Sequence, residues 1–350
     1  MKYRHMTSTP TPLMSRRLLC LRTLPALPVM WLAGCAGAPF STKSTLKVGG
    51  LFAGQRDDRG FMEAGWRGLE QARTELGVST SFIDNIQPQK AALVAALEQL
   101  AGSGADLVIA HGGQNNEACA EVAARFPKTR FVVTQGAVTA SNLSSYDVLQ
   151  EESAYLAGVL AALTTRTGVV GHMSGIRVRP GLKGRAAYAA GVRDTNPAVR
   201  LLTNFSGNQD DNALSYKVAT AQIQQGADVI FTMLNAGRGG VTQACRERKV
   251  RQIGNVIDWV QNDPVVFAGS AMANVGMGVF QAIKDMQTTG APRTGIHKLG
   301  LTYAGAVQLS MAPDIAPAVR ARITRAREAI ASGTLKVPED YTGPEFANPA

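Results

Sequence analysis

The stretch GADLVIA, residues 104–110, returns in altered form as GADVIF at residues 226–231. Each copy begins with Gly-Ala-Asp and continues into an apolar run of the length typical of a buried parallel strand. Glycine suits the positive φ with which many helices end, and the aspartate opens the strand. A supersecondary unit used twice predicts two similar lobes, although two common helix-to-strand turns can also coincide.

Apolar strands and amphipathic helices alternate around both copies. The expected strands are 46–53, 80–84, 106–110, 130–134, 168–173, 199–204, 228–233 and 251–256. The expected helices are 60–76, 88–101, 115–125, 151–165, 181–194, 211–224 and 239–248. Strictly alternating strands and helices indicate parallel sheets with right-handed crossovers. Because the pattern restarts at residue 151, we expect an α/β protein with two doubly wound parallel-sheet lobes.

The last part of the chain completes both lobes in this interpretation. A strand and a helix are expected between residues 265 and 290, and another helix over 315–332. The expected division is a signal peptide 1–34, a lipidated tether 35–45, lobe 1 at 46–150 plus 265–290, lobe 2 at 151–258 plus 296–335, and a loose tail 336–350. The tail is polar and contains proline, which is typical of loosely held chain ends.

An export signal is predicted at the N-terminus. Five basic residues and no acidic one precede an apolar segment, residues 23–34, that is shorter than the roughly 20 residues a membrane span needs. The segment ends in Leu32-Ala33-Gly34-Cys35, which resembles the bacterial lipobox. We therefore expect an acyl (palmitate-type) lipid on Cys35 that anchors the protein on the periplasmic side of a bacterial cell membrane. An ordinary cleavage site, a twin-arginine signal at Arg16-Arg17 and a start at Met14 stay open.

The charge of the chain limits the kinds of partner that we expect. The net charge is +10, but with the five basic residues of the signal removed, 31 basic residues stand against 26 acidic ones. No basic run with interleaved aromatics occurs, so a nucleic-acid partner is not expected.

Cys119 and Cys245 occupy matching places after the two Gly-Ala-Asp strands, which favours two buried thiols over a disulfide.

Several segments, in order, resemble the basic membrane protein (BMP) family of substrate-binding lipoproteins of ABC importers. They are VGGLFAGQRDDRGFMEAGWRGLEQA, GADLVIAHGG, EESAYLAGVLAALTTRTGVVGHMSG, GVRDTNPAVRLLTNFSGNQDD, QGADVIF and IGNVIDW. The resemblance covers nearly the whole mature chain. It implies a type I periplasmic-binding-protein fold, an ABC permease as partner and a purine nucleoside or nucleobase-like ligand held between the lobes. A hinge crossed three times would then lie near 149–152, 258–264 and 290–299.

The resemblance also implies ligand-binding residues. In lobe 1, the acidic pair Asp57-Asp58 and the stacking aromatic Phe61 match the family motif, and capping of a helix is the other role open to Asp58. The next strand end offers His111, Gln114 and Asn115, where His111 can instead be a buried strand-end residue. Phe61 can likewise be a core side chain.

In lobe 2, equivalent strand ends carry Gln209, Asn235, Asp258 and Trp259. Asp258 matches a family acid expected to accept hydrogen bonds from sugar hydroxyls, and Trp259 is a stacking or a hinge-packing side chain. Three positions depart from the family pattern: Phe52 replaces an aspartate, Ser270 to Ala273 lack a lysine, and no second aromatic lies near Gln209. These departures leave the choice among ring ligands open.

Other classes of function are less compatible with the sequence. No HxxxD, GxSxG, HExxH or CxxC arrangement occurs, and no phosphate-binding fingerprint, so we expect no enzyme, no metal and no cofactor. The alternatives are a periplasmic nucleoside-processing enzyme and a ligand-binding subunit of a membrane sensor.

Overall fold

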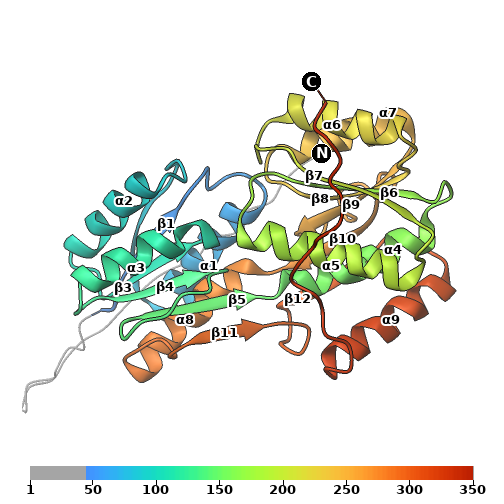
Figure 1. Ribbon diagram of the computed structural model, residues 1–350. Coiled ribbons are helices and arrows are strands. Elements are labelled where there is room, and N and C mark those ends of the chain that lie inside the picture. The colour runs from blue at the N-terminus through green and yellow to red at the C-terminus, as the bar shows by residue number, and fades with distance from the viewer. Residues whose placement is uncertain (1–44, 350) are drawn as a thin grey trace, which may run out of the picture. The chain divides into compact units, whose positions relative to one another are not determined.

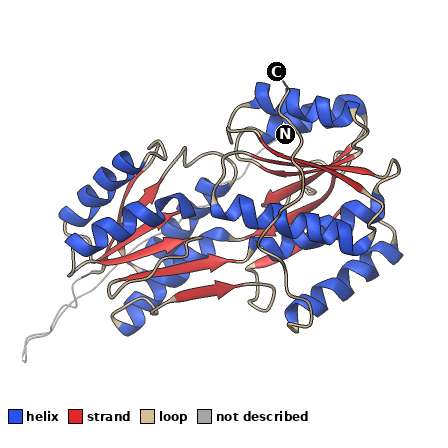
Figure 2. Cartoon of the chain, viewed as in Figure 1, coloured by secondary structure: helices blue, strands red, loops and turns tan. Residues whose placement is uncertain are grey.

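The computed structural model describes residues 45–349 and arranges them around two separate six-stranded sheets (Figures 1 and 2). The first sheet has the order β2-β1-β3-β4-β5-β11 and the second the order β7-β6-β8-β9-β10-β12. The two orders correspond strand for strand, and only β12 runs antiparallel to its neighbour. The predicted pair of doubly wound α/β lobes is therefore confirmed. In such sheets ligands bind outside the carboxyl ends of the strands.

Lobe 1 is the first sheet with its helices. Its strands are β1 (Lys47–Phe52), β2 (Ser79–Ile83), β3 (Leu107–His111), β4 (Arg130–Thr134), β5 (Leu143–Val148) and β11 (Ile296–Leu299). Its helices are α1 (Phe61–Leu76), α2 (Lys90–Gly102), α3 (Asn116–Arg125) and α8 (Val275–Thr289), with the 3-10 turn η1 (Gly113–Asn115) before α3. Helices α1 and α8 pack together, and α2 packs against α3.

Lobe 2 is the second sheet with its helices. Its strands are β6 (Val169–Ser174), β7 (Arg200–Phe205), β8 (Val229–Met233), β9 (Arg251–Val256), β10 (Phe267–Ala273) and β12 (Val307–Met311). Its helices are α4 (Gln150–Thr164), α5 (Arg179–Thr195), α6 (Asn212–Gln224), α7 (Arg238–Arg248) and α9 (Pro317–Ala331). Helix α4 packs against α5 and α9, while α6 packs against α7 (Figure 1).

The repeated Gly-Ala-Asp has the same structural role in both lobes. Gly104 and Gly226 have φ of 84° and 97°, the left-handed conformation that the sequence predicts. Asp106 accepts a hydrogen bond from the backbone N–H of Lys47, at 2.9 Å, where β1 begins. Asp228 accepts one from the N–H of Arg166, at 2.7 Å, just before β6. Each aspartate therefore fixes the start of the first strand of its lobe.

The chain crosses between the lobes three times, and two crossings differ from the expected places. The first follows β5 at Leu149, as expected, but the second lies at Asn274 and the third between β11 and β12. Strand β10, expected in lobe 1, belongs to the second sheet, and β11, expected in lobe 2, pairs with β5 in the first. The exchange arises because strand pairing joins residues distant in sequence, which local periodicity does not record.

The C-terminal tail is packed against lobe 2, so the prediction of a loose tail is wrong. Glu345 forms ion pairs with Arg177 and Arg185, and the N–H of Phe346 donates to the carbonyl of Thr203 at 2.7 Å. The Arg185 guanidinium lies 4.7 Å from the ring centre of Tyr341. These partners belong to helix α5 and its neighbours, which the tail sequence alone cannot reveal.

The cysteine interpretation is confirmed, whereas the signal peptide, the tether and Cys35 lie outside the described residues. Cys119 and Cys245 are free and buried, and burial raises the pKa of each thiol. Between residues 45 and 349, no helix is both long enough and apolar enough to cross a membrane.

Candidate functional site

A small, partly open space lies where the carboxyl ends of the strands of both lobes meet. Its volume is about 40 Å³. Four residues predicted for the site line it together: Phe61 and Gln114 from lobe 1, and Gln209 and Asn235 from lobe 2. The remaining lining residues are Met62, Gln150, Ser174, Gly175, Ile176, Val178, Pro180, Gly181, Met233 and Asn255. We call this volume the interlobe cavity.

Asp58 shapes the lobe 1 wall by fixing the start of α1. Its carboxylate accepts hydrogen bonds from the backbone N–H groups of Gly60, Met62 and Glu63, at 2.8–3.1 Å. These N–H groups belong to the first turn of the helix, where no carbonyl is available to them. Burial raises the pKa of Asp58 even though the three donors oppose that effect. Asp58 thus has the capping role and does not line the interlobe cavity.

His111 holds Phe61 against the cavity. The two rings stack with centroids 4.4 Å apart, and His111 Nε2 lies 2.9 Å from the carbonyl oxygen of Phe61. His111 Nδ1 lies 2.7 Å from Thr134 Oγ1. Complete burial lowers the pKa of His111 to about 4, so the ring is neutral near pH 7. Nε2 then donates to the Phe61 carbonyl, and Nδ1 accepts from the threonine hydroxyl.

Three residues predicted to contact ligand lie behind the lobe 1 wall instead. His111 and Phe52 are fully buried, with their ring centroids 5.8 Å apart. Asn115 is also buried, and its Nδ2 donates to the carbonyls of His111 and Gly112, both at 3.0 Å. These three residues support Phe61 and η1 from within lobe 1 and do not line the interlobe cavity, so their contact with a ligand stays a prediction.

The lobe 2 wall is formed by loops that follow β6, β7 and β8. The carbonyl of Gln209 accepts hydrogen bonds from the N–H groups of Asn235 and Gly237, at 3.1 and 3.0 Å, which joins the last two loops. The Gln209 side chain lies against Gly175, where a Cβ would come within 2.1 Å of Gln209 Cγ. A side chain larger than glycine at position 175 would therefore displace Gln209 from the cavity.

Asp258 and Trp259 border a different space. A wide interlobe groove of about 1300 Å³ runs along α1 and includes both residues, together with Trp66 and Met272. The carboxylate of Asp258 accepts hydrogen bonds from Ser310 Oγ at 2.6 Å, Val260 N at 3.1 Å and Gln261 Nε2 at 3.1 Å. Protein groups thus engage both carboxylate oxygens of Asp258. The expectation that Asp258 and Trp259 share one space with Phe61 is corrected.

Arg238 joins the two lobes beside this groove. Its guanidinium lies 3.5 Å from the ring centre of Trp259, and its Nη2 donates to the carbonyl of Arg59 in lobe 1 at 3.2 Å. Arg238 is buried, and burial lowers its pKa to about 10. A stacked, nearly desolvated guanidinium is stabilised by the ring face, so Trp259 acts as a platform for Arg238.

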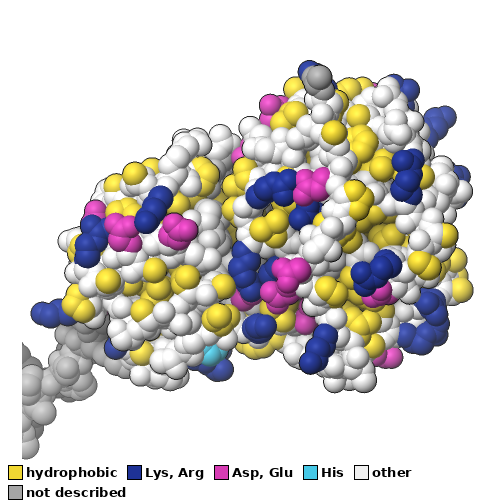
Figure 3. Space-filling view, in the orientation of Figure 1, with side chains coloured by type: hydrophobic (Ala, Val, Ile, Leu, Met, Phe, Trp, Pro, Cys, Tyr) yellow, Lys and Arg dark blue, Asp and Glu magenta, His cyan; other side chains and the backbone are white. Residues whose placement is uncertain are grey.

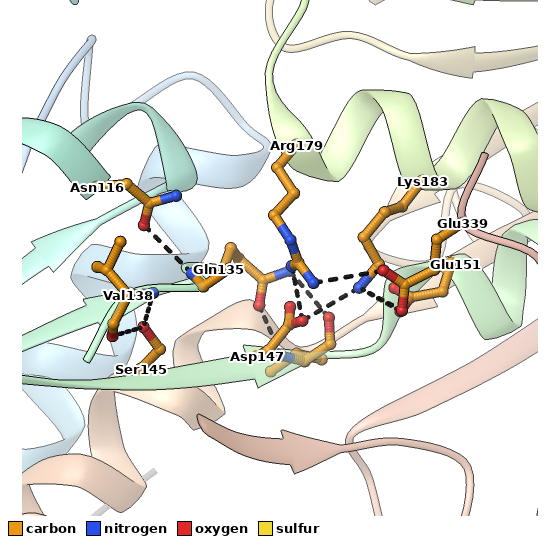
Figure 4. Close-up of polar contacts among 11 residues, drawn as sticks. Asn116, Gln135, Val138, Ser145, Asp147, Glu151, Arg179, Lys183 and Glu339 are labelled. Carbon is orange, nitrogen blue, oxygen red and sulfur yellow. Dashed lines mark hydrogen bonds and ion pairs between the residues drawn. The ribbon is translucent and has the colours of Figure 1, made fainter. Parts of the chain in front are cut away.

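A cluster of charged side chains lies at the first crossing, in the close-up of Figure 4. Asp147 Oδ2, at the end of β5, accepts from Arg179 Nη1 at 2.8 Å and from Lys183 Nζ at 3.1 Å. Lys183 also pairs with Glu151 on α4, and Glu339 of the tail lies 3.5 Å from Arg179 Nη2. We call these five residues the hinge ion cluster. It links β5 of lobe 1 to helices α4 and α5 of lobe 2 and to the C-terminal tail.

The hinge ion cluster is mostly out of contact with solvent. The side chains of Asp147, Glu151 and Lys183 are only 2%, 6% and 4% exposed. Burial raises the pKa of Glu151 to about 7, against the opposing effect of Lys183. Sequence reasoning missed this cluster because its members are distant in sequence. The available signal was the pair Lys183 and Arg185, two basic residues in the glycine- and alanine-rich middle of α5.

Gln150 and Asn255 are two further cavity residues that the sequence interpretation missed. Gln150 is the first residue of α4, directly after the first crossing, and Asn255 lies near the end of β9. Both line the interlobe cavity and are buried. Asn255 offered a signal, since it lies near the end of the predicted strand 251–256 and shortly before Asp258. Gln150 offered none, because the strand that precedes it, β5, was not predicted.

Two further features of the described residues concern metal ligation and surface charge. Among residues 45–349, no group of three or more His, Cys, Asp or Glu side chains is placed to hold a metal ion. On the face shown in Figure 3, basic and acidic side chains lie close to one another in mixed groups. That face therefore shows no broad single-sign patch of the kind that binds nucleic acid.

Comparisons with known proteins agree with this architecture. The family model "Bmp: ABC transporter substrate-binding protein PnrA-like" matches residues 45–340. An uncharacterized lipoprotein of Pyrococcus abyssi is 28% identical, over 82% of this chain and 75% of its own. The "ABC transporter nucleoside-binding protein BmpA" of Lactococcus lactis is 26% identical, over 62% and 65%. A solute-binding protein of an ABC transporter system from Aeropyrum pernix superimposes with a TM-score of 0.75 and 25% identity, over 85% of this chain and 94% of that one.

Proposed function

The chain belongs to the Bmp family of ABC transporter substrate-binding proteins, and from this premise we propose that it captures a small polar ring ligand, a nucleoside or a nucleobase-like compound, between its lobes and delivers it to an ABC permease. The observation that carries the proposal is the meeting of Phe61, Gln114, Gln209 and Asn235 around one interlobe cavity. An aromatic ring supplies a stacking surface, and side-chain amides supply both donors and acceptors for the edge of a ring.

Delivery to a permease follows from opening and closing of the lobes. A permease can distinguish loaded from empty protein only if the ligand changes the populations of open and closed states. The contact between Arg238 and Arg59 and those of the hinge ion cluster join the lobes, and their number can differ between two such states. A ring ligand is much larger than about 40 Å³, the present cavity volume, so the lobes must part to admit it.

Replacing Phe61 with alanine is expected to weaken binding of ring compounds by about tenfold or more, because the stacking surface is lost. A thermal-shift screen with nucleobases and nucleosides measures this, since a ligand that binds only the folded form raises the unfolding midpoint. Phe82→Ala is the matched control: Phe82 is an exposed aromatic of lobe 1 on β2 and is absent from the cavity. An equal midpoint rise in the Phe61→Ala protein would contradict the proposal.

The proposed membrane anchor depends on Cys35. If the thiol carries the acyl lipid, Cys35→Ser should move the protein from the membrane pellet to the soluble extract, because a chain without its acyl groups loses the apolar contacts with the bilayer. Fractionation and immunoblotting of cells expressing either form measure the distribution. The change should leave ligand binding by the folded lobes unaltered. A variant protein that stays in the membrane pellet would rule out this anchor.

A further inference from the structure

Gln150 and Asn255 share an unusual condition within the interlobe cavity. Gln150 is 5% exposed and Asn255 is 7% exposed. Gln150 Nε2 and Asn255 Oδ1 are fully enclosed, and neither has a hydrogen-bond partner among the described residues. A buried polar atom without a partner destabilises the folded chain. Two such atoms from residues lining one cavity indicate that something else supplies the partners.

The rest of the cavity lining is polar but uncharged. Five of its residues carry a side-chain amide, and none of its residues is an aspartate, glutamate, lysine or arginine. The five amides are Gln114, Gln150, Gln209, Asn235 and Asn255. An ionised ligand group would be buried here without an opposite charge, which is strongly unfavourable. The lining therefore selects an uncharged ligand.

The cavity lining also lacks the carboxylate that the family resemblance implies for sugar hydroxyls. Asp258, the acid expected to accept hydrogen bonds from sugar hydroxyls, borders the separate groove, where Ser310, Val260 and Gln261 already donate to it. Met272 lies in the segment where a lysine was expected, and it also borders that groove. A ring without an attached sugar fits these observations better than a nucleoside does.

We propose that the ligand is an uncharged heterocycle with a ring amide, –CO–NH–, and no sugar, and that Gln150 and Asn255 recognise that edge. This rests on the proposed function and narrows it. A side-chain amide presents a donor and an acceptor side by side, so it pairs with a ring amide through two hydrogen bonds in either orientation. The enclosed Nε2 of Gln150 is a donor and the enclosed Oδ1 of Asn255 is an acceptor. The carbonyl of one ring amide can accept from Gln150 while its N–H donates to Asn255, which satisfies both enclosed atoms.

Three related compounds test the ligand class on the purified full-length protein. Hypoxanthine has a ring amide, adenine has the same ring system with an amidine edge, and inosine is hypoxanthine with ribose attached. Calorimetric titration should show hypoxanthine binding at least tenfold more tightly than adenine, because a site built to pair with –CO–NH– rejects an analogue that leaves its groups unpaired. It should also bind at least tenfold more tightly than inosine, because the carboxylate expected to accept hydrogen bonds from the ribose hydroxyls does not line the cavity. Inosine or adenine binding as tightly as hypoxanthine would overturn the inference.

Two variants test the residues. Gln150→Met and Asn255→Leu should each weaken hypoxanthine binding at least tenfold while leaving the unfolding midpoint of the free protein unchanged or higher, because each removes a buried unpartnered group. Tyr188→Phe is the matched control: the Tyr188 hydroxyl is buried and unpartnered but lies in the lobe 2 core. Tyr188→Phe should also leave the unfolding midpoint of the free protein unchanged or higher, but it should bind hypoxanthine as tightly as the unmodified protein does.

The outcomes separate the two proposals. If hypoxanthine binds the Gln150 and Asn255 variants normally while Phe61→Ala abolishes binding, the recognition of the ring amide is wrong and the proposed function stands. If none of the ring compounds binds the unmodified protein, the proposed function fails and this inference fails with it. If Gln150→Met and Asn255→Leu both bind hypoxanthine more weakly while Tyr188→Phe binds it normally, the recognition of the ring amide by Gln150 and Asn255 is supported.

Discussion

Replacing Lys183 with methionine is expected to lower the free energy of unfolding by about 3–5 kcal/mol, the usual effect of removing one partner from a buried ion pair. Lys183 contacts both Asp147 and Glu151, whose side chains are almost inaccessible to solvent. Without the ammonium group, Glu151 has no basic partner within ion-pair distance in the described chain. Urea unfolding at pH 8 measures the loss.

The same experiment has a control and an internal check. Arg246→Met removes one partner from the exposed pair with Asp263, at 2.8 Å, and should change the free energy of unfolding by no more than about 1 kcal/mol. The loss in Lys183→Met should be smaller at pH 5, because the pKa of Glu151 is already raised to about 7 and the unpaired carboxyl becomes protonated. If Lys183→Met lowers the free energy of unfolding at pH 8 by only about 1 kcal/mol, as expected for a surface pair, the cluster is not buried in solution.

Acidification should destabilise the protein through two buried histidines, one in each lobe. Burial lowers the pKa of His111 to about 4 and that of His172 to about 3, from an ordinary value of 6.5. Below pH 6.5 the unfolded chain binds a proton at each histidine while the folded chain does not. Each histidine therefore contributes stability that is complete above pH 6.5 and decreases by about 1.4 kcal/mol per pH unit as the pH falls toward the folded value.

Substituting each histidine separates its contribution to stability from those of other titrating groups. Glu151 is one of these groups: because its pKa is raised to about 7, it stabilises the folded chain as the pH falls from 7 to 4.5. Any destabilisation by His111→Gln at pH 7.5 should shrink by about 1.4 kcal/mol per pH unit below pH 6.5, and His172→Gln should behave the same way. Urea unfolding from pH 7.5 to 4.5 at constant ionic strength measures it. His297→Gln, at a partly exposed histidine, is the control; an equal pH trend there would exclude burial as the cause.

The two buried histidines have similar partners, although they lie on strands that are not equivalent in the two sheets. His111 Nδ1 lies 2.7 Å from Thr134 Oγ1, and His172 Nδ1 lies 2.8 Å from Thr203 Oγ1. In each lobe the histidine and threonine are register partners on adjacent parallel strands. Nothing in the spacing of these residues revealed this correspondence, since β4 and β7 are not equivalent strands of the two sheets.

Part of the candidate site could be predicted because strand ends are visible in the sequence. Phe61, Gln114, Gln209 and Asn235 each follow a predicted strand, and parallel strands place their carboxyl ends at one edge. Asp258 also follows a strand, yet it borders the groove, because Ser310 on β12 binds its carboxylate. The position of β12 beside β10 depends on a pairing that the local pattern does not contain.

The sequence by itself determined the duplicated α/β architecture, since the period of apolar residues and the glycine at each helix end are local consequences of burial and backbone geometry. Only the tertiary structure decided which lobe receives β10 and β11, how the tail is held by Arg177 and Arg185, and that Gln150 and Asn255 line one cavity without partners. The physical reason is that these features depend on contacts between residues far apart in the chain, whose distances are set by packing of the whole fold.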